Sequence, residues 1–198
     1  MDVSTDDDRG VLARAFGRGS FPHQLSWLID NPLRRLILRP QQLADRLPLT
    51  ESGCLLELGA GSGYFSIELA RRVPRGRLEL LDLQPQMRAK ARRKLEQYGF
   101  QNIGYSVSDA SVGLPFPDQT FNVALMVAVL GEVSDQASCL DSLYRTIRSG
   151  GVLAIHEHAP DPDRIKFAAL RSLVEPRGFW FRERWGPAWN YTALFERP

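Results

Sequence analysis

A glycine-rich segment follows an apolar run and precedes a helical pattern. Residues 54–58 have strand character and lead into Gly59-Ala60-Gly61-Ser62-Gly63. Glycines let the backbone turn tightly and approach a ligand closely, and a following helix N-terminus adds partly positive amide groups. In open α/β sheets, ligands lie at the carboxyl ends of the strands, where the strand order reverses. The segment therefore predicts a ligand-binding loop.

The spacing of the glycines and the residue before them separate one ligand class from another. A dinucleotide-binding loop requires a third glycine three residues after the second, and Tyr64 occupies that position. Glu57 precedes the loop at the end of the apolar run, where a carboxylate is costly to bury unless it is paired. A ligand that carries an ammonium group would supply this partner.

Two further carboxylates end the next two predicted strands. Asp82 lies in Leu80-Leu81-Asp82-Leu83, and a carboxylate there can accept hydrogen bonds from both hydroxyls of a ribose. Asp109 follows residues 103–107 and could accept a hydrogen bond from an adenine amino group. Each acid could also be a loop or helix cap. Three carboxylates at three successive strand ends favour a common ligand.

Strand and helix patterns alternate along most of the chain. We expect strands at residues 54–58, 77–81, 103–107, 121–127, 152–156, 179–185 and 191–196 and helices at 32–38, 40–47, 62–73, 85–98, 136–147 and 164–175. The alternation predicts an α/β fold, a Rossmann-like seven-stranded and mostly parallel sheet with helices on both faces. The last two strands lack a helix between them and should form a C-terminal β-hairpin, which makes one strand antiparallel.

The expected organisation is one globular domain with two parts. Residues 1–50 should form an N-terminal flap with lid helices, and residues 51–198 the ligand-binding domain. The net charge of +2 and two scattered cysteines predict no nucleic-acid partner, disulfide framework or zinc site. No apolar stretch approaches the roughly 20 residues that span a bilayer. The acidic N-terminus lacks the pattern of a signal peptide, so we expect a cytoplasmic location.

Several segments together resemble a known family. Residues 55–63 look like motif I of the class I S-adenosylmethionine (SAM)-dependent methyltransferases, and residues 81–87 look like their ribose-binding segment. Residues 108–110 and 114–122 resemble the adenine-binding segment of the subgroup that contains the ubiquinone and menaquinone biosynthesis enzymes. Residues 148–153 are similar to that subgroup's lead into the fifth strand. The resemblance covers roughly residues 50 to 198.

The resemblance implies SAM as cofactor and S-adenosylhomocysteine as product. Glu57 and the loop would hold the methionine part, Asp82 the ribose and Asp109 the adenine. The expected cofactor-binding residues are Glu57, Gly59, Ala60, Gly61, Ser62, Gly63, Asp82, Leu83, Met87, Asp109, Ala110 and Val127. The chain departs from the family at Asn122, usually an aspartate, and at Gly131-Glu132, where many members carry two histidines.

The candidates for catalysis lie after the fourth and fifth strands or on the flap. A general base helps when the methyl acceptor's nucleophile carries a proton. Glu132 and His156 are the first candidates, with His23 and His158 as reserves. The cluster His156-Glu157-His158, followed by Asp161 and Asp163, could contain a base, hold a metal or form a solvated loop. It lacks a distinctive ligand spacing, so no metal is expected.

The predicted function is methyl transfer from SAM to a small-molecule acceptor by in-line displacement. The chain has no Asn/Asp-Pro-Pro-Tyr/Phe segment after residues 121–127, no Pro-Cys pair and no basic stripe interleaved with aromatics. A non-catalytic module that binds SAM or S-adenosylhomocysteine is one alternative. A nicotinamide-dependent oxidoreductase is disfavoured by Tyr64 and by the lack of a Tyr-x-x-x-Lys pair. The aromatic segment 178–191 should pack in the hairpin, line an apolar substrate or form a homodimer interface.

Overall fold

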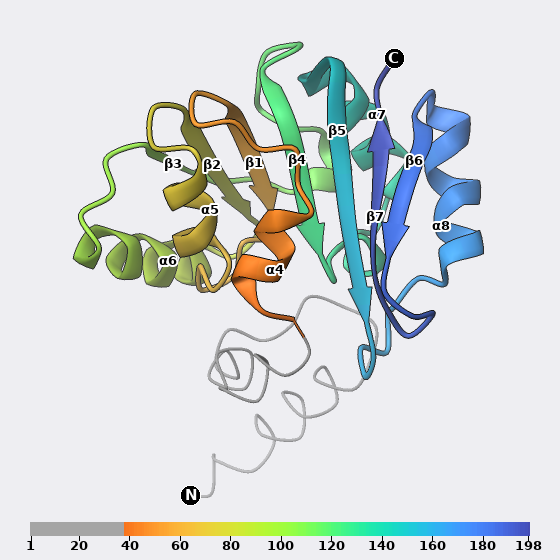
Figure 1. The fold of residues 1–198 in the computed structure, drawn as a ribbon, viewed down its shortest axis with the longest axis horizontal. Helices are drawn as coiled ribbons and strands as arrows, with labels where there is room; N and C mark the ends of the chain where they lie inside the picture. The colour runs from red at the N-terminus through yellow and green to blue at the C-terminus, as the bar shows by residue number, and fades with distance from the viewer. Residues whose placement is uncertain (1–37) are drawn as a thin grey trace, which may run out of the picture.

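A seven-stranded sheet forms the centre of the computed structural model, which describes residues 38–198 (Figure 1). The strand order is β3-β2-β1-β4-β5-β7-β6. The strands are β1 (Cys54–Leu58), β2 (Arg77–Asp82), β3 (Ile103–Val107), β4 (Phe121–Val127), β5 (Ile147–His158), β6 (Trp180–Trp185) and β7 (Asn190–Glu196). The predicted helix at 32–38 lies almost wholly outside the described residues, and the reserve candidate His23 lies outside them altogether.

The direction of each strand confirms the predicted fold class. Strands β1 to β5 are parallel to their neighbours among themselves, whereas β7 runs antiparallel to both β5 and β6. The C-terminal hairpin therefore inserts its second strand between β5 and β6. The strand order reverses between β1 and β4, which is where open α/β sheets bind ligands.

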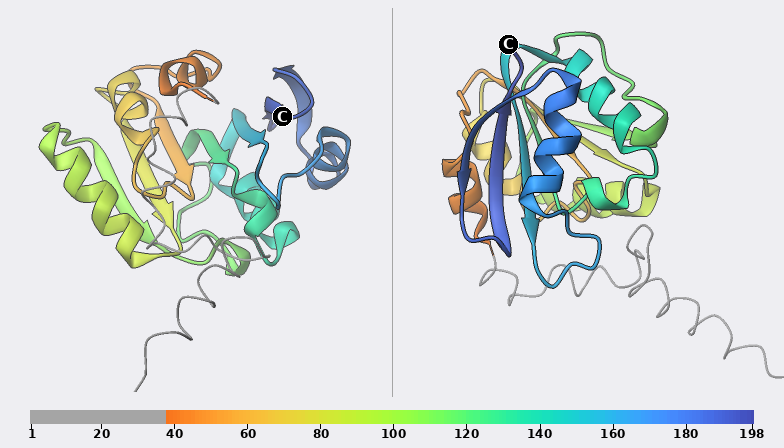
Figure 2. Two further views of the ribbon diagram at one scale, coloured as in Figure 1. Left: turned by 90° about the horizontal axis from the view of Figure 1, so that it is seen from below. Right: turned by 90° about the vertical axis from the view of Figure 1, so that its right-hand side faces the viewer.

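Helices cover both faces of the sheet (Figure 2). Helices α4, α5 and α6 lie on one face, and α7 and α8 lie on the other (Figure 1). The α-helices are α4 (Pro40–Asp45), α5 (Ser66–Arg72), α6 (Pro85–Gln97), α7 (Gln136–Thr146) and α8 (Phe167–Val174), and the short 3₁₀-helices are η2 (Ala110–Val112), η3 (Leu130–Glu132) and η4 (Glu175–Arg177). This double cover explains why the central strands are apolar on both sides.

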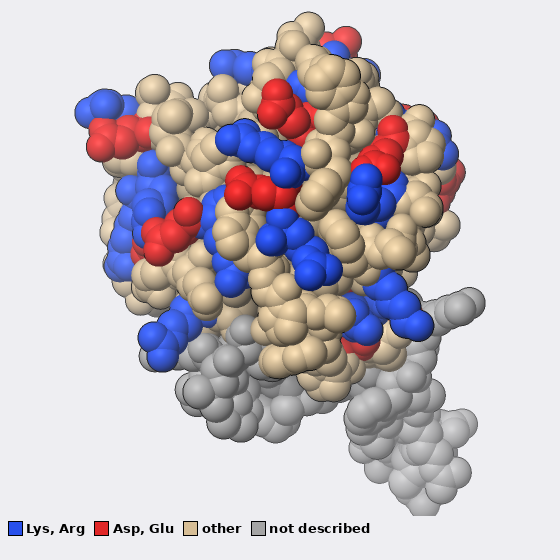
Figure 3. Space-filling view, turned by 45° about the vertical axis from the view of Figure 1, so that its right-hand side comes forward, with Lys and Arg blue, Asp and Glu red and all other residues tan. Residues whose placement is uncertain are grey.

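The surface shown in Figure 3 carries interspersed acidic and basic side chains. Several arginines lie in ion pairs, among them Arg72 with Asp45 at 2.7 Å and Arg177 with Asp141 at 2.9 Å. Exposed pairs of this kind contribute little stability, typically about 0–1 kcal/mol each. The face in Figure 3 has no broad patch of one sign.

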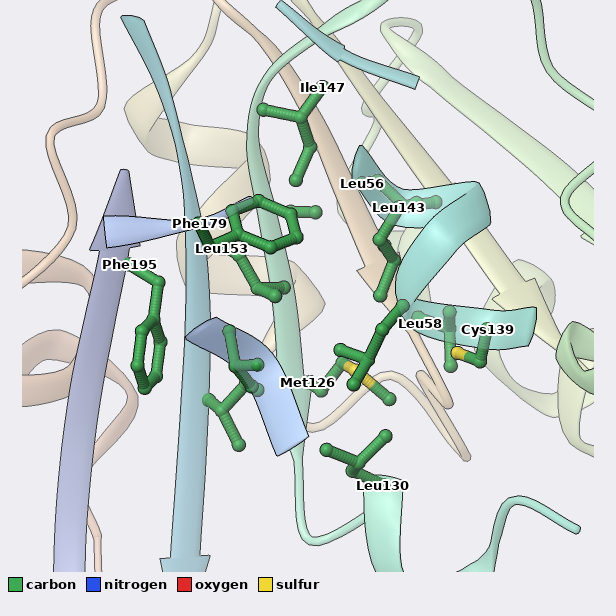
Figure 4. Close-up of a cluster of buried hydrophobic side chains, with 14 of the residues drawn as sticks. Leu56, Leu58, Met126, Leu130, Cys139, Leu143, Ile147, Leu153, Phe179 and Phe195 are labelled. Atoms are coloured by element: carbon green, nitrogen blue, oxygen red, sulfur yellow. The ribbon is translucent and has the colours of Figure 1, made fainter. Parts of the chain in front are cut away.

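Alternation along β1 sends successive side chains into two separate cores. Leu55 packs with the side chains beneath α4 and α5, whereas Leu56 packs with those beneath α7 and α8. Figure 4 shows the second core, which includes Met126, Leu153 and Phe195 of the sheet and Cys139 and Leu143 of α7. A fully buried leucine or phenylalanine stabilises the fold by roughly 1.5–3 kcal/mol relative to an exposed one. The two cores fix the strand ends that carry the polar residues.

Two predicted boundaries are wrong for identifiable reasons. We expected a helix from Ser62, but α5 begins at Ser66 because Gly63 has a φ of 78° and its N–H donates to Ala60 O. We expected the fifth strand at 152–156, but β5 starts at Ile147, directly after α7. The start of β5 pairs with Phe121, and the backbone of Gly150 and Gly151 bonds to Arg197. These long-range contacts extend the strand.

Helix α4 belongs to the core of the sheet domain. Its Leu43 and Ala44 are buried against α5 and the sheet. The described end of the predicted 1–50 segment therefore packs as part of the globular unit. No helix within residues 38–198 is both long and apolar enough to cross a membrane.

Candidate active site

A cavity of about 400 Å³ opens at the carboxyl ends of β1, β2 and β4, a volume typical of small-molecule sites. All but one of the predicted cofactor-binding residues line it, and the exception is Gly63. The cavity wall also includes residues that were not among the predicted site residues, which are Leu58, Tyr64, Phe65, Leu81, Gln84, Ser108, Val129, Val133 and Ser134. The three acids Glu57, Asp82 and Asp109 all contribute to it.

Two glycines of the loop are required for different reasons. Gly59 has a φ of 70°, and a Cβ there would overlap the side chain of Val129. Gly61 has a φ of 55°, but a Cβ there would meet no atom of residues 38–198 within 4 Å. The space above Gly61 lets a ligand lie against the main chain. Gly59 thus serves the packing of the fold, and Gly61 serves the cavity.

Asp82 ties the end of β2 to the glycine-rich loop. Its Oδ2 accepts a hydrogen bond from the N–H of Gly61 at 2.8 Å, and its Oδ1 accepts one from the N–H of Gln84 at 2.8 Å. Burial raises the pKa of Asp82, although both N–H groups favour the carboxylate. Each carboxylate oxygen keeps lone-pair capacity for a further donor, so this side chain fits the two ribose hydroxyls.

Glu57 forms part of the cavity wall at the end of β1. It is buried, and its Oε2 accepts a hydrogen bond from Ser66 Oγ at 2.5 Å. Because Ser66 begins α5, the helix that follows the loop helps to orient the carboxylate. A buried acid on the wall of a cavity fits the ammonium group of the methionine part of SAM.

Asp109 caps a helix, which is one of the two roles that the sequence predicted for it. It is the N-cap of η2, where its Oδ1 accepts hydrogen bonds from Ser111 N at 2.9 Å and Ser111 Oγ at 2.5 Å. These bonds lower the pKa of Asp109. Its place in the cavity wall is compatible with the adenine role, which stays a prediction. Leu83 is half exposed and Met87 buried, and both flank the same end of the cavity.

The wall that follows β4 is apolar apart from one carboxylate and one hydroxyl. Val127, Val129 and Val133 line it together with Glu132 of η3 and Ser134. Ala128 has a φ of 52°, a strained backbone conformation of the kind that clusters at functional sites. The predicted candidate Glu132 therefore lies at the cavity.

Gly131 is one of the positions where many family members carry histidine. A Cβ at Gly131 would overlap the main-chain oxygen of Asp163. The segment between β5 and α8 therefore packs directly on η3 and excludes any side chain at this position. The departure from the family pattern has a steric cause that the sequence alone did not reveal.

The predicted candidates on β5 lie behind the cavity wall. His156 is fully buried and outside the cavity lining, with its Nδ1 3.0 Å from Thr192 Oγ1. The rings of His156 and His158 are 5.7 Å apart between centroids. Across residues 38–198, no group of three or more His, Cys, Asp or Glu side chains is arranged to hold a metal ion.

Glu157 faces the opposite side of β5 and is also fully buried. Its Oε2 accepts a hydrogen bond from Ile165 N at 3.1 Å, and Tyr191 Oη donates to Ile165 O at 2.7 Å. Burial raises the pKa of Glu157 to about 7. Glu157 therefore anchors the segment between β5 and α8, the segment that packs on Gly131.

Comparisons with known proteins agree with this geometry. The family profile described as "Methyltransferase domain" matches residues 55–151. A demethylmenaquinone methyltransferase of Thermus thermophilus is 33% identical over 108 residues, 54% of this chain and 48% of the relative. A ubiquinone/menaquinone biosynthesis C-methyltransferase of Marinomonas sp. is 30% identical over 158 residues, 79% of this chain and 62% of the relative. The chain thus spans about half to two thirds of the length of these relatives.

A solved structure of a SAM-dependent methyltransferase from Aquifex aeolicus shares the fold. It superposes with a TM-score of 0.84 at 20% identity, over 90% of this chain and 100% of the other. Residues 55–151 thus match a methyltransferase domain, and the described residues have the fold of a SAM-dependent methyltransferase. The chain is similar to the class I SAM-dependent methyltransferases, a class whose cofactor is SAM.

Proposed function

We propose that this protein transfers the methyl group of SAM to a small-molecule acceptor. The observation that carries the proposal is the cavity at the strand-order reversal, with Glu57, Asp82 and Asp109 on its wall. SAM supplies an electrophilic methyl group on a sulfonium centre. The enzyme's task is then to align the acceptor's nucleophile with that methyl and to exclude water.

The described residues divide this task between two ends of the cavity. At the donor end, Glu57 would bind the ammonium group, Asp82 the ribose and Asp109 the adenine, so that the cofactor is held at three points. At the acceptor end, Val127 and Val129 would exclude water. Glu132 is the carboxylate in this part of the wall, and we assign it the role of orienting the acceptor or receiving its proton.

A small, partly apolar acceptor is favoured by the valines of the cavity wall and by the mixed charges of the face in Figure 3. The relatives' names make demethylmenaquinone the first compound to test. A metalloid acceptor that needs reactive thiols is disfavoured, because Cys139 is fully buried and burial raises its pKa to about 12. A non-catalytic module that binds SAM would share the donor end and lack turnover.

Three further features belong to the same proposal. The part of residues 1–50 that precedes α4 would act as a flap over the cavity, and the protein would work in the cytoplasm. A homodimer would use the C-terminal hairpin region, where Trp180 and Trp189 are 66% and 55% exposed. Light scattering of the purified chain measures the dimer directly, and a monomer at all concentrations would exclude it.

The central experiment measures binding and turnover separately. Calorimetry should give saturable binding of SAM and S-adenosylhomocysteine and none of NAD. A panel of acceptors with radiolabelled SAM then measures methyl transfer. Glu132→Gln should bind SAM as the unaltered chain does and transfer methyl more slowly. Binding of NAD without SAM would reject the proposal, and SAM binding with no transfer to any acceptor would favour the non-catalytic module.

A further inference from the structure

A short segment joins β5 to α8 and contacts both the C-terminal hairpin and the acceptor end of the cavity. It comprises residues 159–166, which we call the connecting segment. Ala159 N donates a hydrogen bond at 2.8 Å to Trp189 O, in the turn between β6 and β7. Arg164 Nη1 donates one at 2.9 Å to Ala188 O of the same turn. The hairpin therefore binds the connecting segment at two points.

Two side chains of neighbouring strands hold the end of the connecting segment. Glu157 of β5 and Tyr191 of β7 are register partners, so both project from the same face of the sheet. Glu157 Oε2 accepts a hydrogen bond from Ile165 N at 3.1 Å, and Tyr191 Oη donates one to Ile165 O at 2.7 Å. The sheet therefore binds both main-chain polar groups of Ile165.

The burial of these two side chains strengthens the restriction on the connecting segment. Glu157 and Tyr191 are both fully buried. Within residues 38–198, Glu157 Oε1 has no hydrogen-bond partner, so Oε2 carries the hydrogen bonding of this acid. A buried acid is costly without a partner, and a main-chain N–H that loses its acceptor is costly as well. Glu157 and Ile165 are therefore each satisfied only while the connecting segment stays in place.

The middle of the connecting segment packs on the part of the chain that carries Glu132. Asp161 closes a turn there, since its Oδ1 accepts a hydrogen bond from Asp163 N at 2.9 Å. The main-chain oxygen of Asp163 lies so close to Gly131 that a Cβ on Gly131 would overlap it. Gly131 and Glu132 are consecutive residues of η3, and Glu132 lines the cavity. Because a single 3₁₀ turn has few hydrogen bonds of its own, the position of η3 depends on this packing.

We propose that Glu157 and Tyr191 are positioning residues that place Glu132 at the acceptor end of the cavity. They act through the connecting segment and η3, and neither side chain lines the cavity. The donor end does not depend on this route, because Glu57 and Asp82 are held by Ser66 and by the glycine-rich loop. Loss of either positioning residue should therefore impair use of the acceptor and leave SAM binding unchanged. This consequence rests on the proposed function, whereas the placement of η3 does not.

Hydrogen exchange of the full chain without ligand tests the placement of η3. Glu157→Met removes the acceptor for Ile165 N, and Tyr191→Phe removes the donor to Ile165 O. In both variants, we expect peptides that cover residues 129–134 to exchange about fivefold faster, the effect of one lost hydrogen bond. Peptides that cover residues 57–63 should keep their rate.

The matched control for hydrogen exchange is Glu157→Gln, whose amide oxygen can still accept from Ile165 N. Neither region should exchange faster in this variant. Tyr191→Phe keeps the ring that packs 5.6 Å from the ring of Phe167, so it tests the proposal even if Glu157→Met does not fold. An unchanged rate for residues 129–134 in Tyr191→Phe, or an equal increase in both regions, would overturn the proposal.

Kinetics on the same variants tests the consequence for the acceptor. Glu157→Met and Tyr191→Phe should lower kcat/KM for the acceptor about fivefold and leave the Kd for SAM within about twofold, whereas Glu157→Gln should retain both values. In a Glu132→Gln background, Glu157→Met should lower kcat/KM by less than about twofold more, because the carboxylate that it positions is gone. Losses that multiply would overturn the route through Glu132. If the unaltered chain transfers no methyl group, the proposed function fails, while hydrogen exchange still decides the placement of η3.

Discussion

The donor end and the acceptor end of the cavity are built by different kinds of contact. At the donor end, the polar partners are near in the sequence, as in Asp109 with Ser111 and Glu57 with Ser66. At the acceptor end, contacts join distant segments, such as the close packing of Gly131 in η3 on the main chain of Asp163. Local sequence therefore specifies the donor end of the cavity, whereas contacts between distant segments specify the acceptor end.

The largest expected effect is a loss of stability at one glycine of the donor loop. It distinguishes a glycine required by the fold from a glycine required by the ligand. Gly59→Val places a side chain at a positive φ and against Val129, so we expect the free energy of unfolding to fall by about 4 kcal/mol. Urea denaturation measures the loss. Gly61→Val is the matched control, since it meets none of the described residues and should cost only about 1–2 kcal/mol of strain.

The same pair of variants gives opposite results for the ligand. Gly61→Val fills the space above the loop and should abolish SAM binding in calorimetry while the chain stays folded. If Gly59→Val were as stable as the unaltered chain, Val129 would not be the reason for that glycine. If Gly61→Val bound SAM with unaltered affinity, SAM would not lie against the main chain of the loop.

The next effect is on the acceptor side and depends on pH. The pKa of Glu157 is raised from 4.5 to about 7 by burial, so the folded state keeps this proton where the unfolded state loses it. The unfolded state binds fewer protons between these two values, and the free energy of unfolding therefore falls as pH rises through this range. The full penalty, roughly 3 kcal/mol, is present above the folded pKa.

Glu157→Gln removes this titration and keeps an oxygen for Ile165 N. Its stability relative to the unaltered chain should improve by roughly 3 kcal/mol between about pH 4.5 and about pH 8. Urea titrations of both proteins across this range measure the difference. A difference that does not change with pH would show that Glu157 is ionised in the folded state throughout.

A smaller effect tests how the three donor-side acids share the cofactor. Asp82→Asn loses the charge that accepts from Gly61 and Gln84, and we expect SAM binding to weaken about 10- to 100-fold. Asp109→Asn, at an exposed cap, should weaken it by only about threefold. Calorimetry compares the two variants, and the reverse order would place the stronger contact on the adenine side.

The smallest effect is expected at Asn122, where the family usually has aspartate. This residue lies outside both the donor end and the acceptor end of the cavity. Asn122 Oδ1 accepts a hydrogen bond from Cys54 N at 2.9 Å, which joins the starts of β4 and β1. Aspartate offers the same oxygen, so Asn122→Asp should change stability by no more than about 0.5 kcal/mol. SAM affinity should stay within about twofold in the same calorimetric assay. A larger loss of affinity would link this strand start to the cavity.

Sequence patterns predicted the sheet, its antiparallel hairpin strand and most of the residues that line the donor end of the cavity, because these depend on local periodicity and on acids at strand ends. The start of α5 was missed because the turn at Gly63 depends on the exact backbone conformation of the loop. Contacts between segments that are distant in the sequence could not be predicted from local patterns. The overlap between Gly131 and Asp163 and the burial of His156 by other elements arise only when distant segments meet.

The insertion of β7 between β5 and β6 has a consequence for the order of assembly. Within residues 38–198, strand β6 pairs with β7 alone. Tyr191 of β7 also donates a hydrogen bond to Ile165 O, in the segment that packs on Gly131 at the acceptor end. During synthesis, the contacts of the donor end become available once residues up to about 129 have emerged, since Val129 packs against Gly59 and the polar partners precede that point. The acceptor end waits for residues 190–196. A ribosome-bound chain should therefore form its cofactor site before the acceptor end of the cavity is complete.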